Sequence, residues 1–169
     1  MQTLFGKIPS FRKRNDQNTL YTRIISKKVL NFLELKGMQI GKKSNLKIPE
    51  WIKAKGDYSK SFIRGLFDTD GSLILRKRKQ NSISWGQKDK NLVFDLKSML
   101  EKQGYFVCYN KEERHDKRGF VSIIHSIRIN RKEHIKKFIS EIGSSNPYKI
   151  NRCKKMAEKV GMLGFEPRS

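Results

Sequence analysis

The sequence predicts an α+β fold built on an antiparallel sheet. From Tyr58 onward, apolar residues switch between helical spacing and a period of two, which gives the element order α, β, β, α, β, β, α and one more helix. Glycines and capping residues separate these elements at regular intervals. A chain of 169 residues is long enough for one ordinary core, or for two small half-domains that share one.

The first helix of this series is predicted from about Tyr58 to Asp70. One side of it is apolar, and the other carries the small residues Gly65 and Thr69 one turn apart. A glycine in mid-helix costs about 1 kcal/mol relative to alanine and is usually tolerated where another backbone comes close. We therefore expect a second helix to pack against the face formed by Phe62, Gly65 and Thr69.

The elements after this helix follow from alternation, caps and glycine stops. In chain order we predict strands over 72–79 and 82–87, a helix capped by Asp89 and ended by Gly104, strands over 105–111 and 120–129 around a charged loop at 112–119, a helix capped by Asn130 and ended by Gly143, and a last helix opened by Asn146-Pro147.

The N-terminal part repeats a portion of this pattern. A strand over 19–25, a helix capped by Ser26 and a stop at Gly37 match the strand, helix and stop that end at Gly143. Residues 48–52 are predicted to be a short linker whose Trp51 docks onto a core. The predicted domains are a remnant of a first half-domain (its C-terminal part) with a linker at 1–56, a complete half-domain at 57–160 and a tail at 161–169.

Charge indicates the kind of partner. The chain has 38 Lys and Arg against 16 Asp and Glu, a net charge of +22 and a pI near 10.2. Solubility does not require so large a charge, so we expect a polyanion such as nucleic acid.

The two cysteines, Cys108 and Cys153, are too few and too far apart for a disulfide framework or a zinc site. We therefore expect a reducing intracellular location, the cytoplasm or an organelle. The sequence shows no signal peptide or membrane span, and we expect no membrane partner.

Asp70 is placed where helix electrostatics disfavours it. A carboxylate at a helix C-terminus opposes the helix dipole by about 0.3–1 kcal/mol, and Asp68 adds a second acid. Gly71 is predicted to be a left-handed stop. A divalent cation would make the acid favourable, whereas the alternative is a surface Asp-Gly turn. An EF-hand loop is excluded because no further acid follows at the required spacing.

Residues 63–71, Ile-Arg-Gly-Leu-Phe-Asp-Thr-Asp-Gly, resemble the signature of the LAGLIDADG homing endonucleases. In these double-strand DNA nucleases two such helices pack at the centre. The resemblance implies an αββαββα half-domain with a saddle-shaped antiparallel sheet, and Mg²⁺ or another divalent cation as cofactor. It implies that Asp70 is the metal-binding catalytic acid, Gly65 the close helix contact and Asp68 a supporting acid. Arg64 replaces the usual small residue.

The resemblance also implies two further catalytic residues. Gln87, at the end of a predicted strand, corresponds to the residue that positions water near the metal. Lys149, after Asn146-Pro147, corresponds to the lysine that offsets transition-state charge; Lys154 and Lys155 are alternatives.

An antiparallel sheet can lie along the major groove of DNA and present polar side chains to bases and phosphates. Basic and hydroxyl residues on the predicted strands suit this role, although the wet face of a half-exposed sheet has the same composition. The candidates are Arg76, Lys77, Arg78, Lys79, Ser82, Ser84 and Arg128.

Two functions are compatible with the sequence. The first is a site-specific double-stranded DNA endonuclease that needs a second motif helix, from a homodimer or from a separate first-half chain. The alternative is a nucleic-acid binder that does not cleave, such as an RNA maturase or a DNA-binding remnant.

Overall fold

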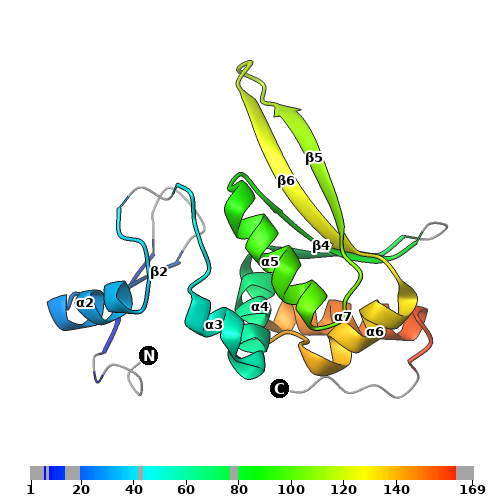
Figure 1. Ribbon diagram of the computed structural model, residues 1–169, viewed down its shortest axis with the longest axis horizontal. Coiled ribbons are helices and arrows are strands. Elements are labelled where there is room, and N and C mark those ends of the chain that lie inside the picture. Colours follow the sequence, from blue (N-terminus) through cyan, green and yellow to red (C-terminus); the bar gives the residue numbers. More distant parts are fainter. Residues whose placement is uncertain (1–5, 7, 14–19, 42–43, 77–79, 163–169) are drawn as a thin grey trace. The chain divides into compact units, whose positions relative to one another are not determined.

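The computed structural model describes residues 6, 8–13, 20–41, 44–76 and 80–162 (Figure 1). The chain divides into two compact units, residues 1–42 and 43–169. Most of the predicted tail at 161–169 lies outside the described residues.

The first unit is an antiparallel hairpin followed by a helix. Strand β1 (Ser10–Lys13) pairs with β2 (Leu20–Arg23), and Ser10 lies opposite Arg23. Helix α2 (Lys27–Leu35) begins after Ser26, whose Oγ accepts a hydrogen bond from the backbone N–H of Val29 at 3.4 Å. Gly37 follows with φ = 87°, so the predicted cap and stop are confirmed. None of the residues of α2 is buried.

The second unit contains the αββαββα series. Its elements are α3 (Glu50–Ala54), α4 (Gly56–Asp70), β3 (Gly71–Ile74), β4 (Ser82–Gln87), α5 (Lys90–Lys102), β5 (Cys108–His115), β6 (Val121–Ile129), α6 (Lys132–Glu141) and α7 (Pro147–Lys159). The four strands form one antiparallel sheet in the order β3-β4-β6-β5. The predicted α+β class is confirmed, and β3 is an edge strand.

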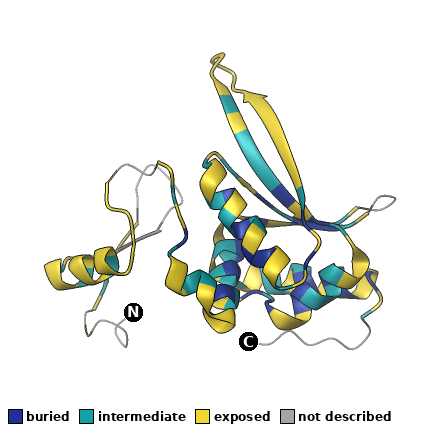
Figure 2. Cartoon of the chain, viewed as in Figure 1, coloured by how far each residue is buried: buried dark blue, intermediate teal, exposed yellow. Residues whose placement is uncertain are grey.

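The core lies between this sheet and its helices, as the distribution of buried residues shows (Figure 2). At its centre Phe67 of α4, Trp85 of β4 and Phe138 of α6 contact one another edge to face, with ring centroids 5.1–5.7 Å apart. All three side chains are fully buried. Because Phe67 is anchored there, the C-terminal turn of α4 has a fixed position.

Residues 44–54, at the start of the second unit, pack on its core through Ile48 and not through Trp51. The backbone N–H of Ile48 donates to Asp95 of α5 at 2.8 Å, and the side chain is 2% exposed. Trp51 is 46% exposed and packs edge to face on Tyr58. The predicted docking of Trp51 is therefore wrong. Residues 50–54, which include most of the predicted short linker, form α3, and Trp51 contacts Tyr58 of α4.

Three predicted boundaries shift. Half of the predicted charged loop is strand, because β5 continues to His115. The turn that follows is closed by Asp116, whose Oδ1 accepts hydrogen bonds from the backbone N–H groups of Arg118 and Phe120. Arg131, not Asn130, is the N-cap of α6, since the first backbone bond of the helix runs to the carbonyl of Arg131. Strand β3 ends at Ile74, five residues earlier than predicted.

Candidate active site

Helix α4 passes directly into β3 at Gly71, which is not the predicted left-handed stop. Gly71 is extended, with φ = −72° and ψ = 152°. A Cβ at this position would lie 2.2 Å from Cδ2 of Phe67 and 2.8 Å from its Cα and carbonyl oxygen. Glycine is therefore required here because Phe67 leaves no space for a side chain, and not because of the backbone conformation. Asp70 is held at the junction of the helix and the strand.

Asp70 contacts the residue that was predicted to act beside it. Its carboxylate is exposed, and Oδ2 accepts a hydrogen bond from Nε2 of Gln87 at 2.6 Å. Gln87 is the last residue of β4, two residues beyond the buried Trp85. The sheet thus places an amide donor against the carboxylate at the end of α4.

Lys149 of α7 closes the C-terminus of α4. Its Nζ donates to the carbonyl oxygens of Gly71, at 2.7 Å, and of Phe67, and lies 5.0 Å from the centroid of the Phe67 ring. A cation at this end of a helix offsets the negative end of the dipole. Burial lowers the pKa of Lys149, and the nearby carboxylates of Asp68 and Asp70 oppose that shift. The alternatives Lys154 and Lys155 are exposed further along α7.

Asp68 is bound to the turn between α6 and α7. Its carboxylate accepts hydrogen bonds from the hydroxyls of Ser144 and Ser145 and from the backbone N–H of Ser145 at 3.1 Å. Burial alone would raise the pKa of Asp68, but these hydrogen bonds outweigh it and hold the pKa below its usual value. Asp68 is consequently a charged structural partner of this turn.

The second basic residue of α7 at this edge is Arg152. Its Nη2 donates to the carbonyl oxygen of Leu73 at 2.5 Å, and Nη1 donates to the Tyr148 hydroxyl at 3.0 Å. Lys149 and Arg152 together cover carbonyl groups of the edge strand that begins at Gly71. A cleft of about 190 Å³ lies between the two elements, lined by Gly71, Ser72, Leu73, Tyr148, Lys149 and Arg152.

The small-residue face of α4 is open. Gly65 and Thr69 are exposed, and a Cβ on Gly65 would have no atom within 4 Å. Phe62 is partly buried against the core of the second unit, so only its remaining surface is available. Arg64 points elsewhere, because its Nε donates to the carbonyl oxygen of Ile142 at 2.7 Å. Within the second unit, packing gives no reason for a glycine at position 65.

The sheet face that points away from the core carries a polar row. Ser72, Ser84, Arg128 and Cys108 are aligned across β3, β4, β6 and β5 by the strand register. Arg128 and Ser72 are exposed, and Ser84 is half-buried. Two of the predicted DNA-binding residues, Ser84 and Arg128, thus lie opposite each other on this face.

The other predicted DNA-binding residues differ in placement. Arg76 is exposed just beyond β3. Ser82 was expected to be accessible but is 4% exposed at the start of β4, so it is withdrawn from the surface. Lys77, Arg78 and Lys79 lie outside the described residues.

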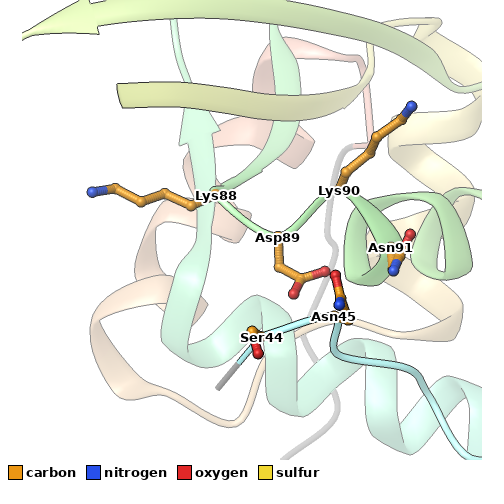
Figure 3. A pocket seen from close by; sticks show the side chains of 6 residues that line it. All are labelled: Ser44, Asn45, Lys88, Asp89, Lys90 and Asn91. Carbon is orange, nitrogen blue, oxygen red and sulfur yellow. The ribbon is translucent and has the colours of Figure 1, made fainter. Parts of the chain in front are cut away.

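A second cleft, of about 450 Å³, lies at the start of α5 and is lined by Ser44, Asn45, Lys88, Asp89, Lys90 and Asn91 (Figure 3). Asp89 caps α5 through the backbone N–H of Leu92 and also accepts from the backbone N–H of Leu46 at 2.8 Å. Its carboxylate is therefore occupied in joining residues 44–46 to α5, and we assign this cleft no chemistry.

The described residues contain no group of three or more His, Cys, Asp or Glu side chains that could hold a metal ion. Asp70 alone offers an exposed carboxylate at the end of α4. Carboxylate oxygens are suitable ligands for Mg²⁺, so the residue type fits.

The fold and the site together define an α+β protein whose central helix ends in an exposed acid beside an amide and a lysine. A profile of the LAGLIDADG-like domain matches residues 57–143, just over half of the chain. The chain therefore belongs to the LAGLIDADG-like family, which is nuclease-related and includes homing endonucleases and maturases. No curated protein matches the chain. Across the described segments, no helix has the length and apolar character of a membrane span.

Four residues around the site were missed by the sequence analysis as functional candidates: Ser144, Ser145, Asn146 and Arg152. The string Ser-Ser-Asn-Pro signals a helix start, which was recognised. Its partner Asp68 lies 76 residues earlier, and no local pattern joins the two.

Proposed function

We propose that this chain is a site-specific double-stranded DNA endonuclease that works with a divalent cation and a second LAGLIDADG helix. The observation that carries the proposal is the arrangement at the C-terminus of α4. There the exposed carboxylate of Asp70 accepts a hydrogen bond from Gln87, and the helix face that carries Gly65 is open. Membership of the LAGLIDADG-like family supports the same reaction.

The need for a second helix follows from what this chain supplies. Asp70 is one carboxylate, and the part of the chain that the structure describes offers no three-residue metal cluster around it. Gly65 has room for a Cβ, yet it costs helix stability. A partner helix packed against Gly65 and Thr69, from a second copy or a separate first-half chain, would explain the glycine and bring a second acid.

Each residue then has a distinct role. Asp70 would hold the cation, and a bound divalent cation would polarise the scissile phosphate and activate water. Gln87, which donates a hydrogen bond to Asp70, would orient that water. Lys149 brings positive charge to the same helix end and offsets charge that develops on the phosphate.

DNA would bind along the outward face of the sheet. Arg128, Ser84 and Ser72 form a row there, and Arg76 is exposed beside it. Arginine and serine can contact guanine or phosphate. The net charge of +22 supports an electrostatic contribution, which makes binding sensitive to salt.

A nucleic-acid binder without cleavage activity is the second candidate, for example an RNA maturase. It is favoured by one observation: a single chain presents one motif helix and an incomplete ligand set. In that case the glycine face and the basic surface would serve assembly and binding alone.

Substitution of Asp70 separates the two candidates. We expect the wild-type chain to cut members of a pool of randomised DNA duplexes when Mg²⁺ is present, and Asp70→Asn to lose at least a hundredfold in cutting rate while salt-sensitive binding persists. Sequencing of new double-strand ends measures the cutting, and gel shift measures the binding.

The matched control for this experiment is Asp57→Asn, which removes an exposed acid from the other end of α4. Equal cutting by wild type and Asp70→Asn would reject the role of Asp70. Binding without cutting by the wild type, with or without an added first-half chain, would favour the second candidate.

A further inference from the structure

Two sets of contacts join the end of α4 to the start of α7, and they involve the residues on either side of Asp70. We propose that Asp68, Ser144, Ser145 and Asn146, which we call the α4–α7 latch, are positioning residues that set Lys149 against the C-terminus of α4. The consequence for catalysis rests on the proposed function. The positioning itself does not.

The first set of contacts runs from α4 to the turn. The Asp68 carboxylate accepts from both serine hydroxyls and from the backbone N–H of Ser145, at 3.1 Å to Oδ2 and 3.3 Å to Oδ1. The backbone carbonyl of Asp68 accepts from Nδ2 of Asn146 at 3.4 Å. One residue of α4 is therefore bonded to three consecutive residues of the turn.

The same turn also fixes the position of the first residues of α7. Oδ1 of Asn146 accepts from the backbone N–H of Tyr148 at 3.0 Å, and the backbone N–H of Asn146 donates to Ser144 Oγ at 3.1 Å. Asn146 thus contacts α4 with its amide nitrogen and caps α7 with its amide oxygen. Lys149 follows three residues later, in the first turn of the helix.

The second set of contacts returns from α7 to α4. Nζ of Lys149 donates to the carbonyl oxygens of Phe67 and Gly71, the residues that flank Asp68 and Asp70. The chain of contacts therefore closes on itself, from residue 68 through the turn to Lys149 and back to residues 67 and 71. A lysine side chain has several rotatable bonds, so this closure removes freedom before any substrate binds.

Helix α7 does not depend on the latch for its packing. Cys153, Met156 and Ala157 are buried in the core, and Arg152 is bonded to Leu73 of β3. Loss of the latch is therefore expected to release Lys149 and leave the rest of α7 in place. If these four residues had a purely structural role, substituting them would lower the stability of the fold and would have no selective effect on Lys149.

The test uses the full chain without metal or DNA. Ser144→Ala/Ser145→Ala removes both hydroxyls, and Asn146→Asp keeps the cap of α7 but puts a carboxylate against the carbonyl of Asp68. Ser140→Ala is the control, because its hydroxyl bonds only a local carbonyl of α6. Ser145→Thr keeps the hydroxyl and serves as the conservative rescue.

The readout is the rate at which an amine-selective acylating reagent labels Lys149, followed by mass spectrometry. Lys154, exposed on the same helix, is the internal reference. We expect the Lys149 to Lys154 ratio to rise threefold or more in the double serine variant and in Asn146→Asp, and to stay unchanged in Ser140→Ala and Ser145→Thr. An unchanged ratio in both latch variants, with a native circular dichroism spectrum, would overturn the proposal.

Cleavage provides the second readout. At saturating DNA we expect the latch variants to lose about tenfold or more in single-turnover rate, with the Kd for DNA within twofold of the wild type. An equal loss in Kd and rate would indicate general damage and count against positioning. If the wild type does not cleave, the proposed function fails, and the labelling ratio still decides whether the latch positions Lys149.

Discussion

Two glycines of the motif, six residues apart, are required for different reasons. Gly71 lies where any Cβ would overlap Phe67, which is itself fixed in the core. Gly65 lies on an exposed helix face with no atom near the position of a Cβ. Gly71 is required by the fold of this chain. On our proposal, Gly65 is required for the close approach of a helix from another chain.

Gly71→Ala should destabilise the second unit. The new methyl group would sit 2.2 Å from Phe67 Cδ2 and 2.8 Å from two backbone atoms, so the α4–β3 junction must shift. We expect a loss of about 1–3 kcal/mol in the free energy of unfolding, as for other overpacked sites. Urea denaturation followed by tryptophan fluorescence measures it. Wild-type stability in this variant would show that Phe67 moves freely.

Gly65→Ala should have the opposite effect on the isolated chain. Alanine favours the helix over glycine by about 1 kcal/mol, and nothing lies within 4 Å to resist it. We expect a more stable monomer that no longer pairs through α4, because the extra methyl groups keep a partner backbone away. Denaturation gives the stability, and sedimentation with DNA and Mg²⁺ gives the assembly state. Stronger assembly in this variant would contradict the proposed contact.

At the scale of elements, the site depends on three junctions. Helix α4 is anchored by Phe67, α7 is joined to α4 by the latch, and β4 delivers Gln87 to Asp70. The N-terminus of α5 adds a fourth junction, where Asp89 binds both its own helix and the segment that contains Leu46.

The cap of α5 predicts a pH dependence of stability. Burial would raise the pKa of Asp89, but hydrogen bonds from the backbone N–H groups of Leu46 and Leu92 outweigh it and lower the pKa. A carboxylate whose folded pKa is depressed stabilises the fold above its unfolded pKa of about 3.9, and that contribution is lost as the pH falls through the folded value.

Asp89→Asn should therefore cost about 1–2 kcal/mol at pH 7, since an amide cannot accept both hydrogen bonds. The difference from the wild type should begin to shrink as the pH falls below about 4, the unfolded pKa, and should vanish only below the lower folded pKa, where the folded wild-type carboxyl is protonated as well. Urea denaturation across this pH range measures it, with the exposed Glu113→Gln as control. A difference that does not vary with pH would exclude the charge of Asp89 as its cause.

At the scale of the whole molecule, the two units differ in how far their described residues are buried. Among the residues whose burial is described, every buried hydrophobic residue lies between Ile48 and Val160. In α6 the side chains of Ile135, Phe138 and Ile139 are buried, whereas no side chain of α2 is. Both units nevertheless contain a strand followed by a helix, β2 and α2 in the first and β6 and α6 in the second, which is the order of the predicted repeat. The hairpin partner β1 of the first unit was not predicted.

We therefore predict that residues 43–169 fold without the first unit. The apolar burial that stabilises a domain is contained in them. A chain of these residues should retain the wild-type near-ultraviolet circular dichroism of Trp85 and unfold in one transition within about 1 kcal/mol of the full-length value. A chain that stays unfolded would assign residues 1–42 an essential part in folding the second unit.

Local patterns predicted most of the elements and part of the site. The caps at Ser26, Asp89 and Asn146 are confirmed because capping is a contact between near neighbours in sequence. The strand ends were predicted less well, since pairing with β6 carries β5 through four charged or polar residues to His115. Trp51 failed as an anchor because α3 turns that side chain towards Tyr58.

The sequence by itself determined the family, the order of the elements, the strong positive charge and the acid at the end of the central helix. These features follow from composition and from the spacing of residues that are close together in sequence. Only the tertiary structure decided that Gly71 is required by Phe67, that Gly65 faces open space, and that Asp68 holds the turn that carries Lys149. The first two facts depend on how the side chains around α4 pack in the folded chain, and the third joins residues up to 82 positions apart in sequence. No local pattern contains either kind of information.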